Sequence, residues 1–187
     1  MKKIFSFMVI INILMVFNGC EKATDKNLSG NSNSSFNEAI ETEAIMKVID
    51  GETKCFFNGN YECWKSYWSH KSYVVQAWNN DDGTADVATG WDKINSRGKA
   101  WIEKYYKNGD NIIHPTVKRE KPTIKFFSDS AAYLTWKQYN SDAEKKYFRT
   151  SFEIRIMEKE STGWKIANVS AFWDTQKNIP FDSLKIN

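Results

Sequence analysis

The sequence predicts an α+β fold in which three N-terminal helices pack on one face of an antiparallel sheet. Apolar side chains recur with a helical period between residues 37 and 107, and with the alternating period of strands from residue 122 onward. Short polar segments such as Ser128-Asp129-Ser130 separate the later strands, as hairpin turns do. Helices followed by a run of strands are typical of this fold class.

The composition indicates one packed domain. The chain has 187 residues, of which 41% are hydrophobic and 15% aromatic, and this excludes a disordered, collagenous or coiled-coil protein. The net charge is +3, and Lys2 and Lys3 at the N-terminus leave only +1 for the remainder. Because a nucleic-acid-binding domain needs a clearly basic surface, no nucleic-acid partner is predicted.

Residues 1–19 predict a lipoprotein signal peptide. Lys2 and Lys3 precede an uncharged apolar run over residues 4–17, which is short for a membrane span and typical of a secretory signal. The run ends in Phe17-Asn18-Gly19-Cys20, which resembles the lipobox of bacterial lipoproteins, although Phe17 and Asn18 depart from its usual residues. The resemblance implies that Cys20 is lipidated and that the protein lies in the bacterial cell envelope, anchored in a membrane. The alternative is an ordinary signal peptide with an incidental cysteine.

Residues 20–36 predict a flexible tether behind that cysteine. The segment is rich in Ser, Asn, Gly and Lys, and its only large apolar residues are Leu28 and Phe36. Such a composition cannot bury enough apolar surface to fold by itself. As a flexible chain it would span roughly 20–24 Å, which would hold the domain close to a membrane.

Three helices are expected in the first half of the domain. Residues 37–58 form the first, with one apolar face that Glu52 alone interrupts, and Asn58-Gly59 ends it. Residues 61–69 form a short second helix, and a strand follows over residues 72–78. The third helix begins at Gly90-Trp91-Asp92 and ends before Asn108-Gly109.

Four strands are expected in the second half. They are Pro122–Phe127, Ala131–Tyr139, Lys146–Glu158 and Gly163–Trp173, and residues 176–187 are a C-terminal tail. In the third of these strands, Phe148, Thr150, Phe152, Ile154 and Ile156 alternate with Arg149, Ser151, Glu153 and Arg155. This alternation predicts that the apolar set faces the core and that the charged set faces water.

Four segments, taken in order, carry a family resemblance over residues 37–175. They are Phe56–Tyr61 after the long helix, the Trp-bearing second helix, Gly90–Ile94, and Gly163–Ala167. This set resembles the nuclear transport factor 2-like superfamily, near its SnoaL-like branch. The resemblance implies a cone-shaped fold in which three helices and a curved antiparallel sheet enclose a pocket. The superfamily contains isomerases, dehydratases, cyclases and non-enzymatic binding proteins, so the fold does not give the activity.

Strand parity predicts which side chains line such a pocket. The candidate ligand-binding residues are Trp101, Tyr105, Trp136, Gln138, Thr150, Asn168 and Ser170. Few and uncharged polar groups among apolar ones are typical of a small-molecule site, and equally of a well-packed core. No carboxylate is expected to face the pocket, because Glu153 is assigned to the outer face.

Three functional hypotheses follow. The first is a non-catalytic envelope domain that binds a small apolar ligand or a protein partner. The second is an isomerase, dehydratase or cyclase, with His70 as general base and Tyr105 orienting the substrate. The third is a homodimer that pairs through its sheets, as members of the superfamily do; it would show an exposed apolar patch on the sheet face of Arg149 and Arg155.

The cysteines and histidines do not predict a metal or cofactor site. Cys55 and Cys63 lie eight residues apart, which matches no zinc spacing. They either form a disulfide between the first two helices, or Cys55 packs as a small apolar residue. His114 is assigned to a loop, and no phosphate-binding or nucleophile motif occurs, so no cofactor and no metal are predicted.

Overall fold

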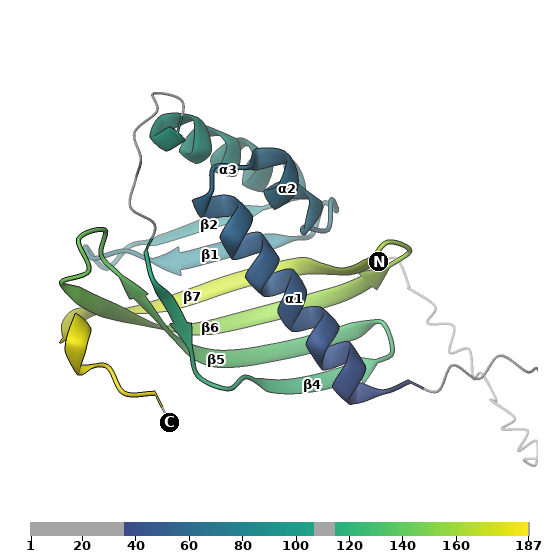
Figure 1. Cartoon of the computed structure of the whole chain (residues 1–187). Helices are drawn as coiled ribbons and strands as arrows, with labels where there is room; N and C mark the ends of the chain where they lie inside the picture. The colour runs from purple at the N-terminus through teal and green to yellow at the C-terminus, as the bar shows by residue number, and fades with distance from the viewer. Residues whose placement is uncertain (1–35, 107–114, 187) are drawn as a thin grey trace, which may run out of the picture. The chain divides into compact units, whose positions relative to one another are not determined.

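The computed structural model describes residues 36–106 and 115–186. Three helices pack against a curved, mixed sheet of seven strands, which confirms the α+β class (Figure 1). The helices are α1 (Glu38–Phe57), α2 (Tyr61–Ser66) and α3 (Trp91–Tyr106), with a short 3₁₀ helix η1 (Phe181–Ser183). The strands are β1 (Val75–Asn79), β2 (Ala85–Thr89), β3 (Val117–Arg119), β4 (Thr123–Ser128), β5 (Ala131–Ser141), β6 (Tyr147–Glu160) and β7 (Gly163–Pro180). No helix in the described ranges is long and apolar enough to span a membrane.

The sheet is ordered β2-β1-β7-β6-β5-β3, and β4 also pairs with β5. All neighbours are antiparallel except β1 and β7, which run parallel. The expectation of a purely antiparallel sheet is therefore wrong at this one contact. The chain enters β1 from α2 rather than from a hairpin, so β1 can lie beside the last strand in either direction. The short strands β2 and β3 were not expected from the sequence.

Helix α1 lies across the concave face of the sheet, as its apolar face predicts (Figure 1). Its N-terminus is capped by Asn37, whose Oδ1 accepts hydrogen bonds from the amides of Ala39 at 3.0 Å and Ile40 at 3.2 Å. Two side chains of this helix, Ile45 and Ile49, are fully buried. They meet a single core of aromatic and aliphatic side chains, which includes Trp64, Trp68, Leu134, Met157 and Ile166.

Helices α2 and α3 lie beside the β2–β1 edge of the sheet (Figure 1). Trp64 of α2 is buried in the core and approaches α3 at Gly98. A Cβ atom at Gly98 would lie 2.2 Å from the Trp64 ring, so only glycine lets the two helices pack this closely.

The face assignment expected for β6 is wrong. Ser151, Glu153 and Arg155 face the helices, with Glu153 only 1% and Arg155 8% exposed. Phe152 is 49% exposed on the opposite face, and Phe148 is buried there because Phe181 of η1 stacks on it at 4.8 Å between ring centroids. The inner face carries a buried charged pair and the outer face carries partly exposed apolar side chains, so alternation alone could not tell which one lines the interior.

The face assignment of β7 changes at a β-bulge. Ile156 pairs with Asn168 but Met157 pairs with Ile166, so Ala167 is an extra residue in β7. Trp164 and Ile166 face inward as expected, whereas the strand beyond the bulge has the opposite parity. The strand also continues to Pro180 rather than ending at Trp173, so residues 176–180 belong to the sheet and not to a tail.

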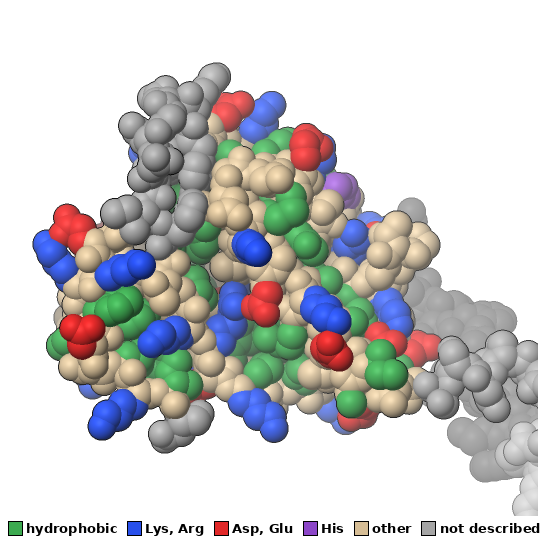
Figure 2. Space-filling model, in the orientation of Figure 1, with side chains coloured by type: hydrophobic (Ala, Val, Ile, Leu, Met, Phe, Trp, Pro, Cys, Tyr) green, Lys and Arg blue, Asp and Glu red, His purple; other side chains and the backbone are tan. Residues whose placement is uncertain are grey.

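The exposed apolar residues of the sheet lie on the face away from the helices. Phe152, Ile156, Phe172 and Val87 are between 40% and 59% exposed, and the strand register places them on one side. This is the face opposite to that of Arg149 and Arg155, on which an apolar patch would have favoured the homodimer hypothesis. On the helix side, acidic and basic side chains are intermixed, in agreement with the small net charge (Figure 2).

Candidate functional site

A cavity of about 480 Å³ lies between α1 and the inner face of the sheet. One wall comes from the last turns of α1, and the floor comes from β5, β6 and β7. The lining side chains are both aromatic and charged: Glu52, Thr53, Phe56, Phe57, Trp78, Pro115, Gln138, Asn140, Ser141, Glu153, Arg155, Val169, Ala171 and Trp173. The cavity therefore has the amphipathic lining that small-molecule sites use.

The floor carries a buried ion pair. Arg155 Nη1 lies 2.7 Å from Glu153 Oε2, and Ser151 Oγ donates to Glu153 Oε1 at 2.5 Å. The Arg155 guanidinium also lies over the Trp136 ring, 5.0 Å from its centroid. Because the two charges compensate each other, the pair supplies hydrogen-bonding groups to the cavity without adding net charge.

Glu52 is a second carboxylate at the cavity, on the last part of α1. Its Oε1 accepts a hydrogen bond from the indole Nε1 of Trp64 at 2.8 Å, and no ion pair to Glu52 occurs in the described structure. Burial raises the pKa of Glu52, although the charge of Arg155 and the Trp64 hydrogen bond act against this. A carboxyl group in this position can hold a proton more readily than an exposed one.

A hydrogen-bonded network fixes the polar end of the cavity. Arg119 of β3 donates from Nε to Gln138 Oε1 at 2.8 Å and from Nη2 to Thr53 Oγ1 at 2.9 Å. Its Nη1 lies 2.6 Å from Asp50, so this arginine links the sheet to α1. Gln138 in turn donates from Nε2 to Asn140 Oδ1 at 3.1 Å. The network holds Gln138 in a single orientation at the cavity.

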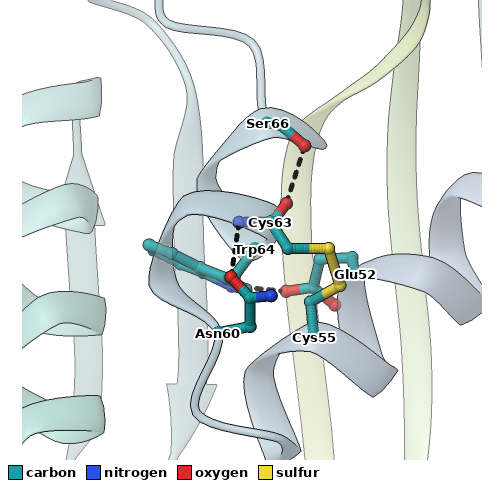
Figure 3. The surroundings of a disulfide bond; sticks show 6 residues. All are labelled: Glu52, Cys55, Asn60, Cys63, Trp64 and Ser66. Atoms are coloured by element: carbon teal, nitrogen blue, oxygen red, sulfur yellow. Dashed lines mark hydrogen bonds between the residues drawn. A yellow bond between two sulfur atoms is a disulfide. The ribbon is translucent and has the colours of Figure 1, made fainter.

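Cys55 and Cys63 form a disulfide between α1 and α2, so the first of the two sequence alternatives is present in the structure (Figure 3). Their Cα atoms are 5.7 Å apart. Cys55 lies one turn after Glu52, and Cys63 directly precedes Trp64, so the bridge joins the two helices beside the Glu52–Trp64 hydrogen bond (Figure 3). It thereby constrains the wall of the cavity.

Of the predicted ligand-binding residues whose side chains the structure describes, only Gln138 lines this cavity. Thr150, Asn168 and Ser170 lie on the opposite face of the sheet, and Asn168 and Ser170 bond to each other there. Trp136 is buried beneath Arg155, and Trp101 stacks on Phe56 at 4.5 Å, so each supports a group at the cavity. Tyr105 belongs to the last turn of α3, but its side chain is outside the described part of the structure, as is His114.

His70 does not lie at the cavity. It is exposed after α2, its ring stacks on Trp91 at 4.0 Å, and its Nε2 lies 2.9 Å from the carbonyl oxygen of Lys65. A carbonyl oxygen can only accept, so Nε2 carries the proton and donates. These contacts hold His70 on the surface and give no support to the role of general base that the enzyme hypothesis gives it.

The expectation of a pocket without carboxylates is also wrong, because Glu52 and Glu153 both line it. One signal in the sequence pointed to each residue. Glu52 interrupts an otherwise apolar helix face, and Glu153 and Arg155 are opposite charges two residues apart on one strand face. Charged residues at core-facing positions are costly unless they are paired or functional.

Among the described residues, no group of three or more His, Cys, Asp or Glu side chains could hold a metal ion. The carboxylates of the cavity are instead engaged by arginine, serine and tryptophan donors. The arrangement provides hydrogen bonding, orientation and one proton-holding carboxyl group.

Glu52→Gln is expected to stabilise the protein at pH 7 by about 1 kcal/mol, because it removes a buried charge and keeps an acceptor for Trp64. The folded-state pKa of Glu52 lies above its ordinary value of 4.5, so the folded state binds more protons than the unfolded state at pH values between the two. The contribution of Glu52 to wild-type stability therefore falls as the pH rises from 4.5 through its folded-state pKa. Urea denaturation should show the gain at pH 7 and none below pH 4.5; an equal gain at both values would contradict the assignment.

Comparison with known proteins shows a fold likeness. No protein-family model matches the chain, and no curated protein matches its sequence. An NTF-2 like protein of unknown function from Shewanella oneidensis MR-1 superposes with a TM-score of 0.52 at 18% identity, covering 70% of this chain and 98% of its own. An NTF2-like protein with a cystatin-like fold from Novosphingobium aromaticivorans gives 0.54 at 12% identity, covering 74% and 85%.

A third similar structure is an NTF2-like family protein from Streptomyces avermitilis for which a dehydratase activity has been suggested. It superposes with a TM-score of 0.53 at 11% identity, covering 73% of this chain and 98% of its own. Identities this low carry information on architecture and not on activity. The helices on a curved sheet, the cavity between them and these superpositions together show that the chain has the nuclear transport factor 2-like fold.

Proposed function

We propose that this protein is a lipid-anchored domain of the bacterial cell envelope that binds a small, largely apolar molecule in the cavity beneath α1. The observation that carries the proposal is the division of the lining into an aromatic part and a polar part. Phe56, Trp78 and Trp173 offer flat apolar surface, while Gln138 and the Glu153–Arg155 pair offer fixed hydrogen-bonding groups. A ligand with an apolar ring system and one polar group matches both parts.

The energetics favour burial as the main source of affinity. Each Å² of apolar ligand surface removed from water contributes about 25 cal/mol, and loss of ligand freedom offsets part of the total. The polar groups need no rearrangement, because Arg119 already holds Gln138 and Ser151 already holds Glu153. We expect them to orient the ligand rather than to provide most of the affinity.

Ala171→Leu tests the cavity, because Ala171 is buried at its lining and a larger side chain takes up part of its volume. Native mass spectrometry of wild-type protein from its own envelope should show a retained small molecule, and the variant should bind it at least tenfold more weakly, which corresponds to about 1.4 kcal/mol. Ser170→Leu is the matched control, since its side chain points to the opposite face. Equal retention by both variants would contradict binding in this cavity.

The proposed anchor rests on the lipobox-like Gly19-Cys20 at the end of the apolar run. Cys20→Ser is expected to move the protein out of the membrane fraction or to leave it with an uncleaved leader. Intact-mass analysis of the wild type should show a diacylated N-terminal cysteine. A mature wild-type chain that starts at an unmodified residue would rule the anchor out.

A second candidate function is proton-transfer catalysis in the same cavity, and Glu52 is the observation that favours it. Its carboxyl group faces an aromatic-lined cavity, has no ion-pair partner in the described structure, and has a pKa raised by burial. Turnover of enone or steroid-like carbonyl compounds that Glu52→Gln abolishes and His70→Ala preserves would establish it. No turnover by the wild type, together with a retained ligand, would leave binding as the function.

A further inference from the structure

Apolar side chains gather on the surface at the end of the molecule where the described chain begins. Among the described residues, the two most exposed large apolar side chains are Phe127 at 69% and Ile40 at 63%, and Phe36 is 40% exposed. The Phe36 ring packs on that of Phe126 with 5.1 Å between the centroids, so the start of α1 lies against the end of β4 (Figure 1). We refer to Phe36, Ile40 and Phe127 as the apolar end.

The fold holds these side chains in exposed positions. Asn37 caps α1 and accepts a hydrogen bond from the amide of Ile40 at 3.2 Å, which fixes the first turn. The pairing of β4 with β5 shifts register between Phe126 and Ser128, so Phe127 is an extra residue at a β-bulge. Each Å² of apolar surface left in water costs about 25 cal/mol relative to burial, so a partner that covers these side chains is favoured.

The partner is indicated by the chain that precedes the described residues. Phe36 is the first described residue, and Cys20 lies 16 positions before it. The inference rests on the proposed lipidation of Cys20, because a lipid there would keep Phe36 within roughly 20–24 Å of the membrane surface. A tether of this length gives the apolar end a high effective concentration at the bilayer.

The charges beside the apolar end are mixed in sign. Glu38 and Asp129 are exposed next to it, and so is Lys125 of β4. Lys159, at the end of β6, lies 2.6 Å from Glu41 and is therefore already paired. Attraction to anionic lipid is thus not the expected source of a membrane contact. Burial of apolar side chains in the interfacial layer is, as in other segments that lie on a membrane surface.

From these features we infer that the apolar end inserts into the interfacial layer of the membrane that holds Cys20, and thereby orients the domain. The two acyl chains expected on Cys20 already provide the attachment, so the apolar end contributes orientation rather than affinity. The cavity is lined by the last turns of α1, roughly 20 Å further along the helix. Contact at the first turn of α1 would therefore leave the cavity outside the bilayer.

The test uses the wild-type lipoprotein with isotope-labelled isoleucine methyl groups, in phosphatidylcholine nanodiscs that hold one chain each. The discs contain a lipid with a spin label just below the head group, which broadens the NMR signals of methyl groups close to it. The Ile40 signal, assigned with Ile40→Val, should lose most of its intensity relative to discs without the label. Ile179 is the internal control, since it pairs with Phe148 at the other end of the sheet, and its signal should be unchanged.

A pair of variants tests whether the contact depends on the apolar end. Phe127→Glu should restore the Ile40 signal, because insertion would now bury a carboxylate. Phe172→Glu is the matched control: Phe172 is 56% exposed on the sheet face away from the helices, so Ile40 should stay broadened. Phe127→Ser removes the ring without adding a charge and should restore part of the signal. Unchanged broadening in Phe127→Glu would overturn the inference.

Intact-mass analysis of the same sample separates failure of the anchor from failure of the inference. A diacylated protein whose Ile40 signal keeps its intensity would overturn the inference and leave the anchor in place. Equal broadening of Ile40 and Ile179 would also overturn it, because the domain would have no fixed orientation. A chain without acyl groups that does not bind the discs would overturn both proposals. A change at Ile40 that occurs only when two chains share a disc would assign the surface to a second copy and overturn the inference.

Discussion

Arg155→Met is expected to destabilise the folded protein by about 3–5 kcal/mol, the largest effect of any single substitution considered. Arg155 is 8% exposed and its only described carboxylate partner, Glu153, is 1% exposed. Removing the arginine leaves a buried carboxylate whose one remaining hydrogen-bond donor among the described residues is Ser151. Urea denaturation of the wild type and the variant at pH 7 measures the difference directly.

A double variant separates the cost of breaking the pair from its net contribution. Glu153→Gln/Arg155→Met removes both charges and keeps an acceptor for Ser151, so it should recover more than half of the loss. If the double variant is as unstable as Arg155→Met, the loss comes from the packing of the Arg155 side chain and not from the unpaired charge of Glu153. A loss below about 1 kcal/mol in the single variant would show that water reaches the pair.

Cys55→Ser/Cys63→Ser is expected to lower the free energy of unfolding by about 2.5 kcal/mol, from the loop that the bridge closes in the unfolded chain. The two cysteines are eight residues apart, which gives a short loop and hence a value near the lower end for disulfides. For a domain of this size the loss corresponds to a fall of about 5–10 °C in Tm. Differential scanning calorimetry measures it.

The same measurement under reducing conditions provides the control. A reductant should lower the Tm of the wild type to that of the double variant and leave the variant unchanged. Because the bridge joins α1 to α2 beside Glu52 and Trp64, ligand retention in the cavity should also fall (Figure 3). A reductant that leaves the wild-type Tm unchanged would show that the thiols are free in solution.

The helices and most strands were predictable because their signals are local. Helix α1 was expected at residues 37–58 and lies at Glu38–Phe57, since its apolar face and its Asn37 cap need no information from the rest of the chain. The short strands β2 and β3 were not predicted. β3 is only three residues long, too few to show an alternating pattern, and it is held by pairing with β5.

The candidate site was less predictable, for two physical reasons. In β6, apolar and charged side chains alternate along the strand. The rule that apolar residues face the core fails there, since Phe152 and Ile156 lie on the outer face while Glu153 and Arg155 are buried on the inner one. In β7, one extra residue at Ala167 reverses the parity, so Asn168 and Ser170 point away from the cavity. A bulge depends on pairing with the neighbouring strand and leaves no mark in the strand's own sequence.

The sequence by itself determined the α+β class, the three helices and the meander of strands, because periodicity and turn chemistry act over a few neighbouring residues. The likeness to the nuclear transport factor 2-like fold came instead from the resemblance of four ordered segments to that superfamily. Only the tertiary structure decided that Glu52, Glu153 and Arg155 meet at one cavity, that His70 stays on the surface, and that β1 lies parallel to β7. The cavity and the β1–β7 pairing join residues about a hundred positions apart. The placement of these side chains and strands depends on strand register and on the desolvation of paired charges. Both are established only when the sheet has formed and packed against α1.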